Sequence, residues 1–224
     1  MAAKSLQELF VEELRDAYDG EKRLTKALPK MAKASGSEEL RAAFTNHLRE
    51  TEGQIKRLEQ VFRTIDEPVR GKKCDGLMGI IEEGKHAIEE LDGSVLDAAL
   101  IAGAQRAEHY EIAAYGTLAY FAEMLGNDRA KNLLGQTLDE EKAADEKLST
   151  IAKSSVNRKA LMAAGTDDEE EPMTRSSRGS GARRMASTSS RGHGSRAMAS
   201  DRSRGGVRGN AGGRRRSRST RGRR

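Results

Sequence analysis

The stretch FVEELRDAYDGEKRLTKAL, residues 10–28, places an apolar side chain at every third or fourth position. This spacing puts the apolar side chains on one face of an α-helix, where they can pack into a core. Glu21 falls in the middle of that face. Burying an unpaired carboxylate costs on the order of several kcal/mol, a large part of the stability of a domain. A helix that buries Glu21 therefore needs a compensating positive charge beside it.

Three later stretches also carry polar side chains on an apolar helical face. They are residues 38–65, 94–125 and 128–153, and the polar side chains lie near the middle of each stretch. A helix rises about 1.5 Å per residue, so short turns between paired helices bring these positions to about the same height. The side chains concerned are Glu21, His47, Glu50, Glu108, Glu111 and Glu141.

The order of the helical stretches predicts an all-α fold. A helix over residues 5–34, in which Pro29 introduces a bend or a restart, precedes the helix over residues 38–65. Residues 67–93 form a long connection that contains one short helix near residues 77–91. Short loops force antiparallel neighbours, whereas the long connection can run the length of a bundle. The sequence therefore predicts a ferritin-like four-helix bundle with one long crossover.

Local signals predict where these helices begin and end. Ser35 or Ser37 can cap the second helix, because a serine side chain accepts a hydrogen bond from a free backbone N–H of the first turn. Ser94 and Asp97 form a predicted capping box at the start of the third long helix. Gly126 follows that helix and is typical of a helix C-terminus.

Composition and charge limit the class of protein. Aromatic residues make up only 4% of the 224 residues and charged residues 33%, which favours long helices over a β-sandwich or barrel. The single cysteine, Cys74, excludes an internal disulfide and indicates a reducing compartment. The first ten residues do not form a secretory signal, and no stretch approaches the roughly 20 apolar residues of a membrane span. We therefore expect a cytoplasmic protein that does not enter a membrane.

Charge divides the chain into parts. Residues 173–224 contain 16 Arg and one Asp, a net charge of +15, which leaves −10 for the other residues out of a total of +5. We expect the bundle over residues 1–157, an acidic linker over residues 158–172 and a tail over residues 173–224. The tail has too little apolar surface to fold, so we expect it to be disordered.

The arginines of the tail are typical of a segment that binds nucleic acid and would associate the protein with the nucleoid. Such binding is electrostatic, independent of base sequence and weakened by salt. Two alternatives remain open, in which the tail neutralises the acidic bundle or only aids solubility. The arginines expected to contact phosphates are Arg183, Arg184, Arg214, Arg215, Arg216, Arg218, Arg221, Arg223 and Arg224.

The polar side chains of the predicted core are ligands that hard divalent cations prefer. Iron and manganese bind carboxylate and imidazole, and two such ions need bridging carboxylates between them. Residues three apart project side by side from a helix, so His47 and Glu50 can serve one site. The sequence predicts two iron or manganese ions, with Gln54 and Asp145 as further ligands or as hydrogen-bond partners of the ligands. The predicted ligands are Glu21, His47, Glu50, Glu108, Glu111 and Glu141.

An alternative without metal stays open, in which these acids face solvent and pair with Lys or Arg. The usual ferritin-like pattern has a Glu-x-x-His motif on two helices. Here residues 47–50 have the reverse order and residues 128–153 have no His, so the number and identity of the metals are open. We expect Tyr18 and Tyr115 either to bond the carboxylates or only to pack, and Glu140 to face solvent.

Four motifs extend this interpretation. They are SLQELF at residues 5–10, DGEKRLTKALPKM at 19–31, AEHYEIAAYGTL at 107–118 and LDEEKAAD at 138–145. In these motifs the chain resembles the YciF-type ferritin-like family of bacterial stress-associated proteins, over roughly residues 5–155. The resemblance implies a ferritin-like bundle, a homodimer, a dinuclear metal site and a role in stress responses. The arginine-rich tail lies outside it.

Two functions follow as hypotheses. In the first, the protein is a di-metal carboxylate protein of oxidoreductase type, which reacts with peroxide or oxygen and protects nucleic acid held by the tail. In the alternative, it is a non-enzymatic, nucleoid-binding stress scaffold that uses the bundle only for dimerisation. A cage-forming iron store is a third hypothesis.

Overall fold

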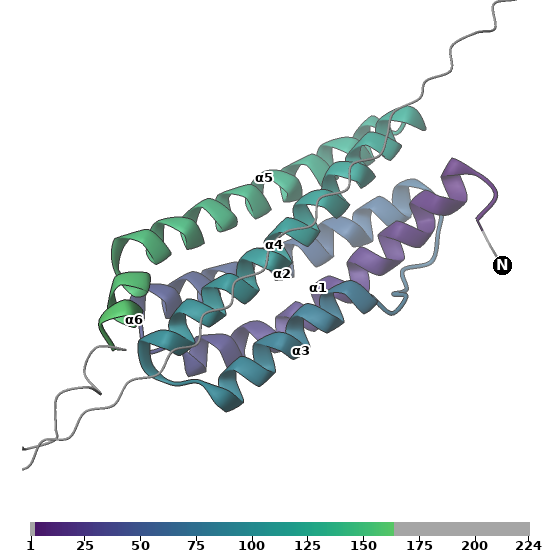
Figure 1. Ribbon diagram of the computed structural model, residues 1–224. Coiled ribbons are helices and arrows are strands. Elements are labelled where there is room, and N and C mark those ends of the chain that lie inside the picture. Colours follow the sequence, from purple (N-terminus) through teal and green to yellow (C-terminus); the bar gives the residue numbers. More distant parts are fainter. Residues whose placement is uncertain (1–2, 164–224) are drawn as a thin grey trace, which may run out of the picture. The chain divides into compact units, whose positions relative to one another are not determined.

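The computed structural model describes residues 3–163 of the chain (Figure 1). These residues contain helices and no strands, so the prediction of an all-α fold is confirmed. Two short segments follow the last long helix: a π-helical turn and a terminal helix that runs past residue 157, the predicted end of the bundle. The elements are α1 (Leu6–Ala34), α2 (Glu38–Thr64), α3 (Asp75–Glu90), α4 (Gly93–Met124), α5 (Asp128–Ile151), η1 (Ala152–Val156) and α6 (Asn157–Ala163).

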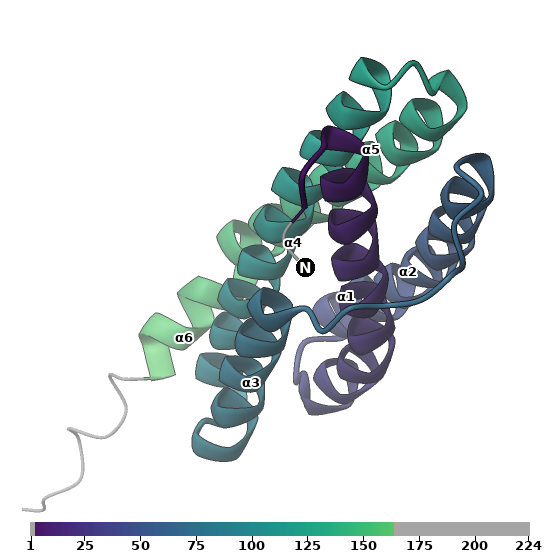
Figure 2. The ribbon, with the colours of Figure 1, turned by 90° about the vertical axis from the view of Figure 1, so that its right-hand side faces the viewer.

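The four long helices pack as a bundle. Helix α1 packs against α2, and α4 against α5, and each helix of one pair also contacts a helix of the other pair. Helix α3 belongs to the long connection and lies alongside α1 and α4 (Figures 1 and 2). Short loops join α1 to α2 and α4 to α5, whereas the connection between the two pairs is long. The predicted helical bundle is therefore confirmed.

Polar side chains define the helix ends. The side chain of Ser5 accepts a hydrogen bond from the backbone N–H of Glu8, and the side chain of Ser37 caps α2 in the same way. Asn127 caps α5 after a turn in which Gly126 has a φ of 73°, a left-handed conformation that favours glycine. Helix α1 continues through Pro29 to Ala34 and does not restart there. The bounds of α1, α2 and α4 lie within one residue of those predicted.

The predicted capping box at the start of α4 is wrong. Asp92 is the N-cap residue, and no side-chain hydrogen bond caps this end of α4. The carboxylate of Asp97 instead accepts hydrogen bonds from the backbone N–H groups of Gly36 and Ser37, each at 2.9 Å. Asp97 therefore ties the middle of the connection between α1 and α2 to α4, a contact between residues about 60 positions apart.

The apolar core consists of two clusters along the bundle. One includes Leu28 and Leu100, and the other includes Phe10 and Leu58. On each long helix, buried polar residues separate the residues of one cluster from those of the other. These polar residues are Glu21 on α1, His47, Thr51 and Gln54 on α2, Glu108 and Glu111 on α4, and Thr137 and Glu141 on α5. A polar layer thus crosses the bundle at mid-height, where the sequence predicts it.

Candidate metal centre

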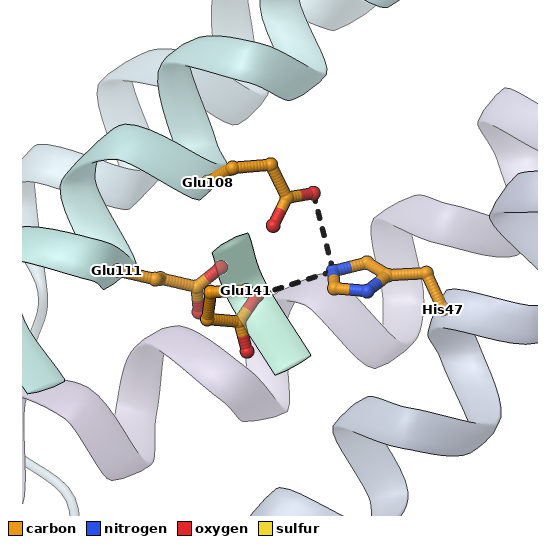
Figure 3. A group of neighbouring side chains, drawn as sticks. All are labelled: His47, Glu108, Glu111 and Glu141. Carbon is orange, nitrogen blue, oxygen red and sulfur yellow. Dashed lines mark ion pairs between the residues drawn. The ribbon is translucent and has the colours of Figure 1, made fainter. Parts of the chain in front are cut away.

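Four side chains of the polar layer converge inside the bundle. His47 comes from α2, Glu108 and Glu111 from α4, and Glu141 from α5 (Figure 3). Each offers one nitrogen or oxygen atom, and these four atoms lie within 4.8 Å of one another. All four residues are buried. The arrangement joins three helices around one small polar volume.

Contacts within the group centre on the imidazole of His47. Its Nε2 atom lies 3.3 Å from Oε1 of Glu108 and 3.9 Å from Oε2 of Glu141 (Figure 3). Its Nδ1 atom lies 3.4 Å from Oε2 of Glu50, on the solvent side. The imidazole is thus oriented by a carboxylate at its outer nitrogen, while its inner nitrogen faces the buried acids.

Glu21 lies beside this group and is fully buried. The hydroxyl of Tyr115 donates a hydrogen bond to Oε1 of Glu21. The side-chain amide of Gln54 donates to Glu141 and, at 3.2 Å, to Glu140. Tyr115 and Gln54 thus hold two of the acids in place, as a hydrogen-bonding shell around a metal site does.

Several polar atoms of the layer have no hydrogen-bond partner among residues 3–163. They include the Oε2 atoms of Glu21, Glu108, Glu111 and Glu141 and the hydroxyl oxygen of Thr51. A buried polar atom without a partner is costly, and native structures contain few of them. Four such carboxylate oxygens in one layer are available to bind a positively charged ligand.

Burial changes the protonation of these acids. It raises the pKa of Glu21 to about 8, of Glu108 to about 7 and of Glu141 to about 9. The pKa of Glu111 is raised well above its ordinary value, first by burial and then by the charges of Glu21 and Glu141. Without a cation, Glu21, Glu111 and Glu141 therefore favour the protonated form at neutral pH, and a bound metal ion would replace those protons.

The pKa of His47 is raised and the pKa of Glu50 is lowered, because the two side chains pair. Burial acts to lower the pKa of His47, but its hydrogen bond with Glu50 and the charges of Glu141 and Glu21 raise it. The hydrogen bond with His47 lowers the pKa of Glu50. Glu50 therefore stays ionised beside the imidazole.

The six predicted ligands do not occupy equivalent places. Five are buried, so they do not face solvent as the alternative interpretation requires. Glu50 is the exception, since 47% of its side chain is exposed and its contact with the group is through His47. Asp145 lies apart from the four-residue group, where it accepts a hydrogen bond from Gln105 at 3.0 Å and pairs with His109 at 3.5 Å.

Two features of the layer differ from the prediction or lie outside it. Glu140, expected to face solvent, is only one-third exposed and forms a two-point ion pair with Arg57. Arg57 also donates to the hydroxyl of Thr137 at 3.1 Å. Arg57 lies three residues after Gln54, so the helical period alone would have placed both side chains near one face of α2. The tail arginines and the predicted linker after residue 163 lie outside the described residues.

A cavity of about 330 Å³ lies between α2, α4 and α5 and borders the candidate centre. His47, Glu50, Glu108 and Lys147 are among the residues that line it.

Among residues 3–163, the helices are too short or too polar to span a membrane.

Comparisons with known proteins place the chain in a family. Residues 5–161 match the family described as Domain of unknown function (DUF892). The chain is 48% identical to Protein YciF of Escherichia coli strain K12 over 162 residues, which cover 71% of this chain and 98% of that protein.

Solved structures agree with this assignment. The crystal structure of the E. coli stress protein YciF matches with a TM-score of 0.67 and 47% identity, over 70% of this chain and 99% of that chain. YcfI from Rhodopseudomonas palustris matches with a TM-score of 0.65 and 45% identity, over 66% of this chain and 96% of that chain. A protein of Xanthomonas campestris pv. campestris shares the fold, with a TM-score of 0.55 and 20% identity over 73% and 97% of the two chains. The chain belongs to the YciF (DUF892) family.

Proposed function

We propose that this chain is a ferritin-like, di-metal carboxylate protein of the cytoplasmic stress response, which holds two iron or manganese ions and reacts with peroxide or oxygen. The observation that carries the proposal is the buried group of His47, Glu108, Glu111 and Glu141, whose ligand atoms lie within 4.8 Å of one another. The stress protein YciF, to which the chain is similar, supports the link to stress.

The donor set fits a hard divalent cation. One imidazole and three carboxylates match the preferences of iron and manganese, whereas a copper or zinc site built on thiolates would need cysteine. Each of the three acids has one oxygen without a partner among residues 3–163. A second ion would share Glu111 or Glu141 and take Glu21 as a further ligand. Glu21 is electrostatically coupled to both of those residues, which supports this placement.

Bound iron or manganese supplies electrons for the reduction of peroxide or oxygen. The residues of the chain supply orientation and access. Tyr115 holds Glu21 and Gln54 holds Glu141, so both carboxylates keep one orientation. The cavity lined by His47, Glu50 and Lys147 offers a small polar oxidant a path from solvent to the inner acids. A proton that a buried carboxylic acid releases when a metal ion binds can leave along the same path.

Anaerobic titration of the full-length, metal-free protein with Fe(II) tests the proposal. Optical and elemental measurements should give about two ions per chain, as expected for a paired carboxylate site. Glu141→Gln should abolish tight binding, while Glu21→Gln should leave one ion. Asp139→Asn is the matched control, because Asp139 is a neighbour of Glu141 on α5 whose side chain is 82% exposed. Unchanged stoichiometry in Glu141→Gln would refute the proposed ligand set.

We further propose that residues 173–224 bind nucleic acid, which would place the protein at the nucleoid. Support comes from the 16 Arg and one Asp of this segment, a charge density that favours a phosphate backbone. Fluorescence anisotropy with labelled DNA should show binding that weakens steeply as salt rises. Replacing Arg214, Arg215 and Arg216 with Gln should weaken binding and reduce its salt dependence. Arg63→Gln, on the surface of α2, is the control.

A non-enzymatic nucleoid scaffold remains the competing function, with the bundle as a dimerisation module. It predicts that the metal-free protein folds and binds DNA normally, and that bound iron does not react with hydrogen peroxide. Sedimentation of the full-length chain would give the proposed homodimer and would separate it from a cage of many copies. Oxidation of two Fe(II) ions per added peroxide would exclude the scaffold as the sole function.

A further inference from the structure

A large cavity lies between α1, α3 and α4, next to the candidate metal centre. Its volume is about 510 Å³, within the range of roughly 300–1,000 Å³ typical of pockets for small molecules. Its walls are largely apolar and include Leu24 on α1, Ile81 on α3 and Ala104 on α4. His47 and Glu108 form part of the lining, so the cavity extends to the polar layer.

Two glycines keep part of this volume open. Gly84 lies within α3 and Gly103 within α4, and both line the cavity. A Cβ atom added at either position would meet no heavy atom of the described residues within 4 Å, apart from the immediate helix backbone. Glycine in a helix interior destabilises the helix relative to alanine. The open space is therefore built into two different helices in spite of that cost.

A row of lysines borders the same cavity. Lys22, Lys26 and Lys30 follow one another at four-residue intervals along α1, over a length of about 12 Å. Like charges at this spacing destabilise a helix. None of the three forms an ion pair with a carboxylate of residues 3–163, although Lys22 lies over the ring of Tyr18 at 5.3 Å. The other nearby cation on α1, Arg23, is already paired with Asp19.

We infer that this cavity binds a fatty acid with a chain of about twelve carbons. The lysine row would hold the carboxylate at the surface, because exposed cations without partners attract an anion. The hydrocarbon chain would lie along the apolar walls, beside Gly84 and Gly103, and its end would approach His47 and Glu108. Burial of the chain supplies the main driving force, and the lysines select the charge of the head group. This binding site goes beyond the proposed function and requires no metal.

Calorimetric titration of full-length protein with dodecanoate, in the presence of excess chelator, tests the inference directly. We expect one molecule bound per chain. Acetate has the head group without the chain, and dodecyltrimethylammonium has the chain with the opposite charge. Neither should bind measurably if both the apolar walls and the lysine row contribute.

Two sets of variants locate the site. Lys26→Ala combined with Lys30→Ala should weaken dodecanoate binding about tenfold, as expected for the loss of two partly exposed ion pairs. Lys33→Ala, also on α1 but outside the cavity lining, should leave binding unchanged. Gly103→Leu and Gly84→Leu should each abolish binding by filling the cavity. Gly116→Leu, on α4 but away from the cavity, is the matched control, and circular dichroism checks that every variant is folded.

Three outcomes would overturn the inference. The first is absence of binding heat with dodecanoate at two well-separated temperatures, at any concentration below micelle formation, because burial of an apolar chain gives little heat near one temperature only. The second is unchanged binding in folded Gly103→Leu and Gly84→Leu. The third is that these variants become monomers while the natural chain forms a dimer and does not bind dodecanoate. That result would show that a second copy of the chain covers this surface. Because the titration is done without metal, failure of the Fe(II) experiment does not affect it.

Discussion

The hydroxyl of Tyr115 on α4 donates a hydrogen bond to the carboxylate of Glu21 on α1, 94 positions earlier in the chain. Both side chains are buried, with at most 1% of either residue exposed. The second oxygen of Glu21 has no partner among residues 3–163, so Tyr115 is the hydrogen-bond donor that holds this acid. The pair links the two helical hairpins at the level of the candidate centre.

Tyr115→Phe should therefore destabilise the metal-free protein by about 1–3 kcal/mol, the cost of a buried acceptor left without a donor. The ring is retained, so loss of packing contributes little. Urea denaturation followed by circular dichroism measures the effect. Tyr120→Phe is the control, because Tyr120 is 59% exposed on the same helix. Equal unfolding midpoints for the two variants would contradict this role of Tyr115.

Stability of the metal-free protein should fall as the pH rises. The acids of the layer have an ordinary pKa of 4.5, raised to about 7 in Glu108, about 8 in Glu21 and about 9 in Glu141. Between these values the folded state binds more protons than the unfolded state, so each rise in pH favours unfolding. The contribution is complete below pH 4.5, falls progressively as the pH rises above that value, and is fully lost once the pH has passed the folded-state pKa values of about 7 to 9. Urea midpoints measured in chelator from pH 5 to 9 test this, and Glu141→Gln should flatten the slope.

Metal binding should release protons at pH 6 to 7. A divalent cation binds the ionised carboxylate, so acids with a raised pKa, such as Glu141 and Glu21, must first lose a proton. Titration calorimetry in buffers of different ionisation enthalpy counts the protons. Asp139→Asn should leave the count unchanged, because the side chain of Asp139 is 82% exposed and lies outside the four-residue group. Binding without proton release would show that the acids are charged in the metal-free protein.

Asp97→Ala should weaken the start of α2, although Asp97 belongs to α4. The substitution leaves the N–H groups of Gly36 and Ser37 without their acceptor and removes a negative charge near a helix N-terminus. We expect a loss of about 1.5–3 kcal/mol, typical of hydrogen bonds to a charged group. Ser94→Ala should change stability little, because the predicted capping box does not form. Thermal denaturation of the two variants distinguishes these outcomes, and a larger loss in Ser94→Ala would reverse the assignment.

Much of the fold could be read from local patterns. Ser5 and Ser37 lie at helix starts, where their side chains accept hydrogen bonds from free backbone N–H groups. The polar layer was also predictable, since periodicity gives the face of a helix and the rise per residue gives the height. Glu50 shows the limit of this reasoning. It lies three residues from His47 and shares a broad helical face with it, yet its side chain is 47% exposed.

The sequence by itself determined four helices, their order and the level at which acids enter the core, because these depend on spacing along one chain. Only the tertiary structure decided which acids meet, that Asp97 binds the loop before a distant helix, and that Gly84 and Gly103 face the same open volume. The physical reason is that the sequence does not fix how each helix is rotated about its own axis relative to its neighbours. A helical period defines an apolar arc about 100° wide, and the packing of neighbouring helices decides which edge of that arc is enclosed and which meets solvent.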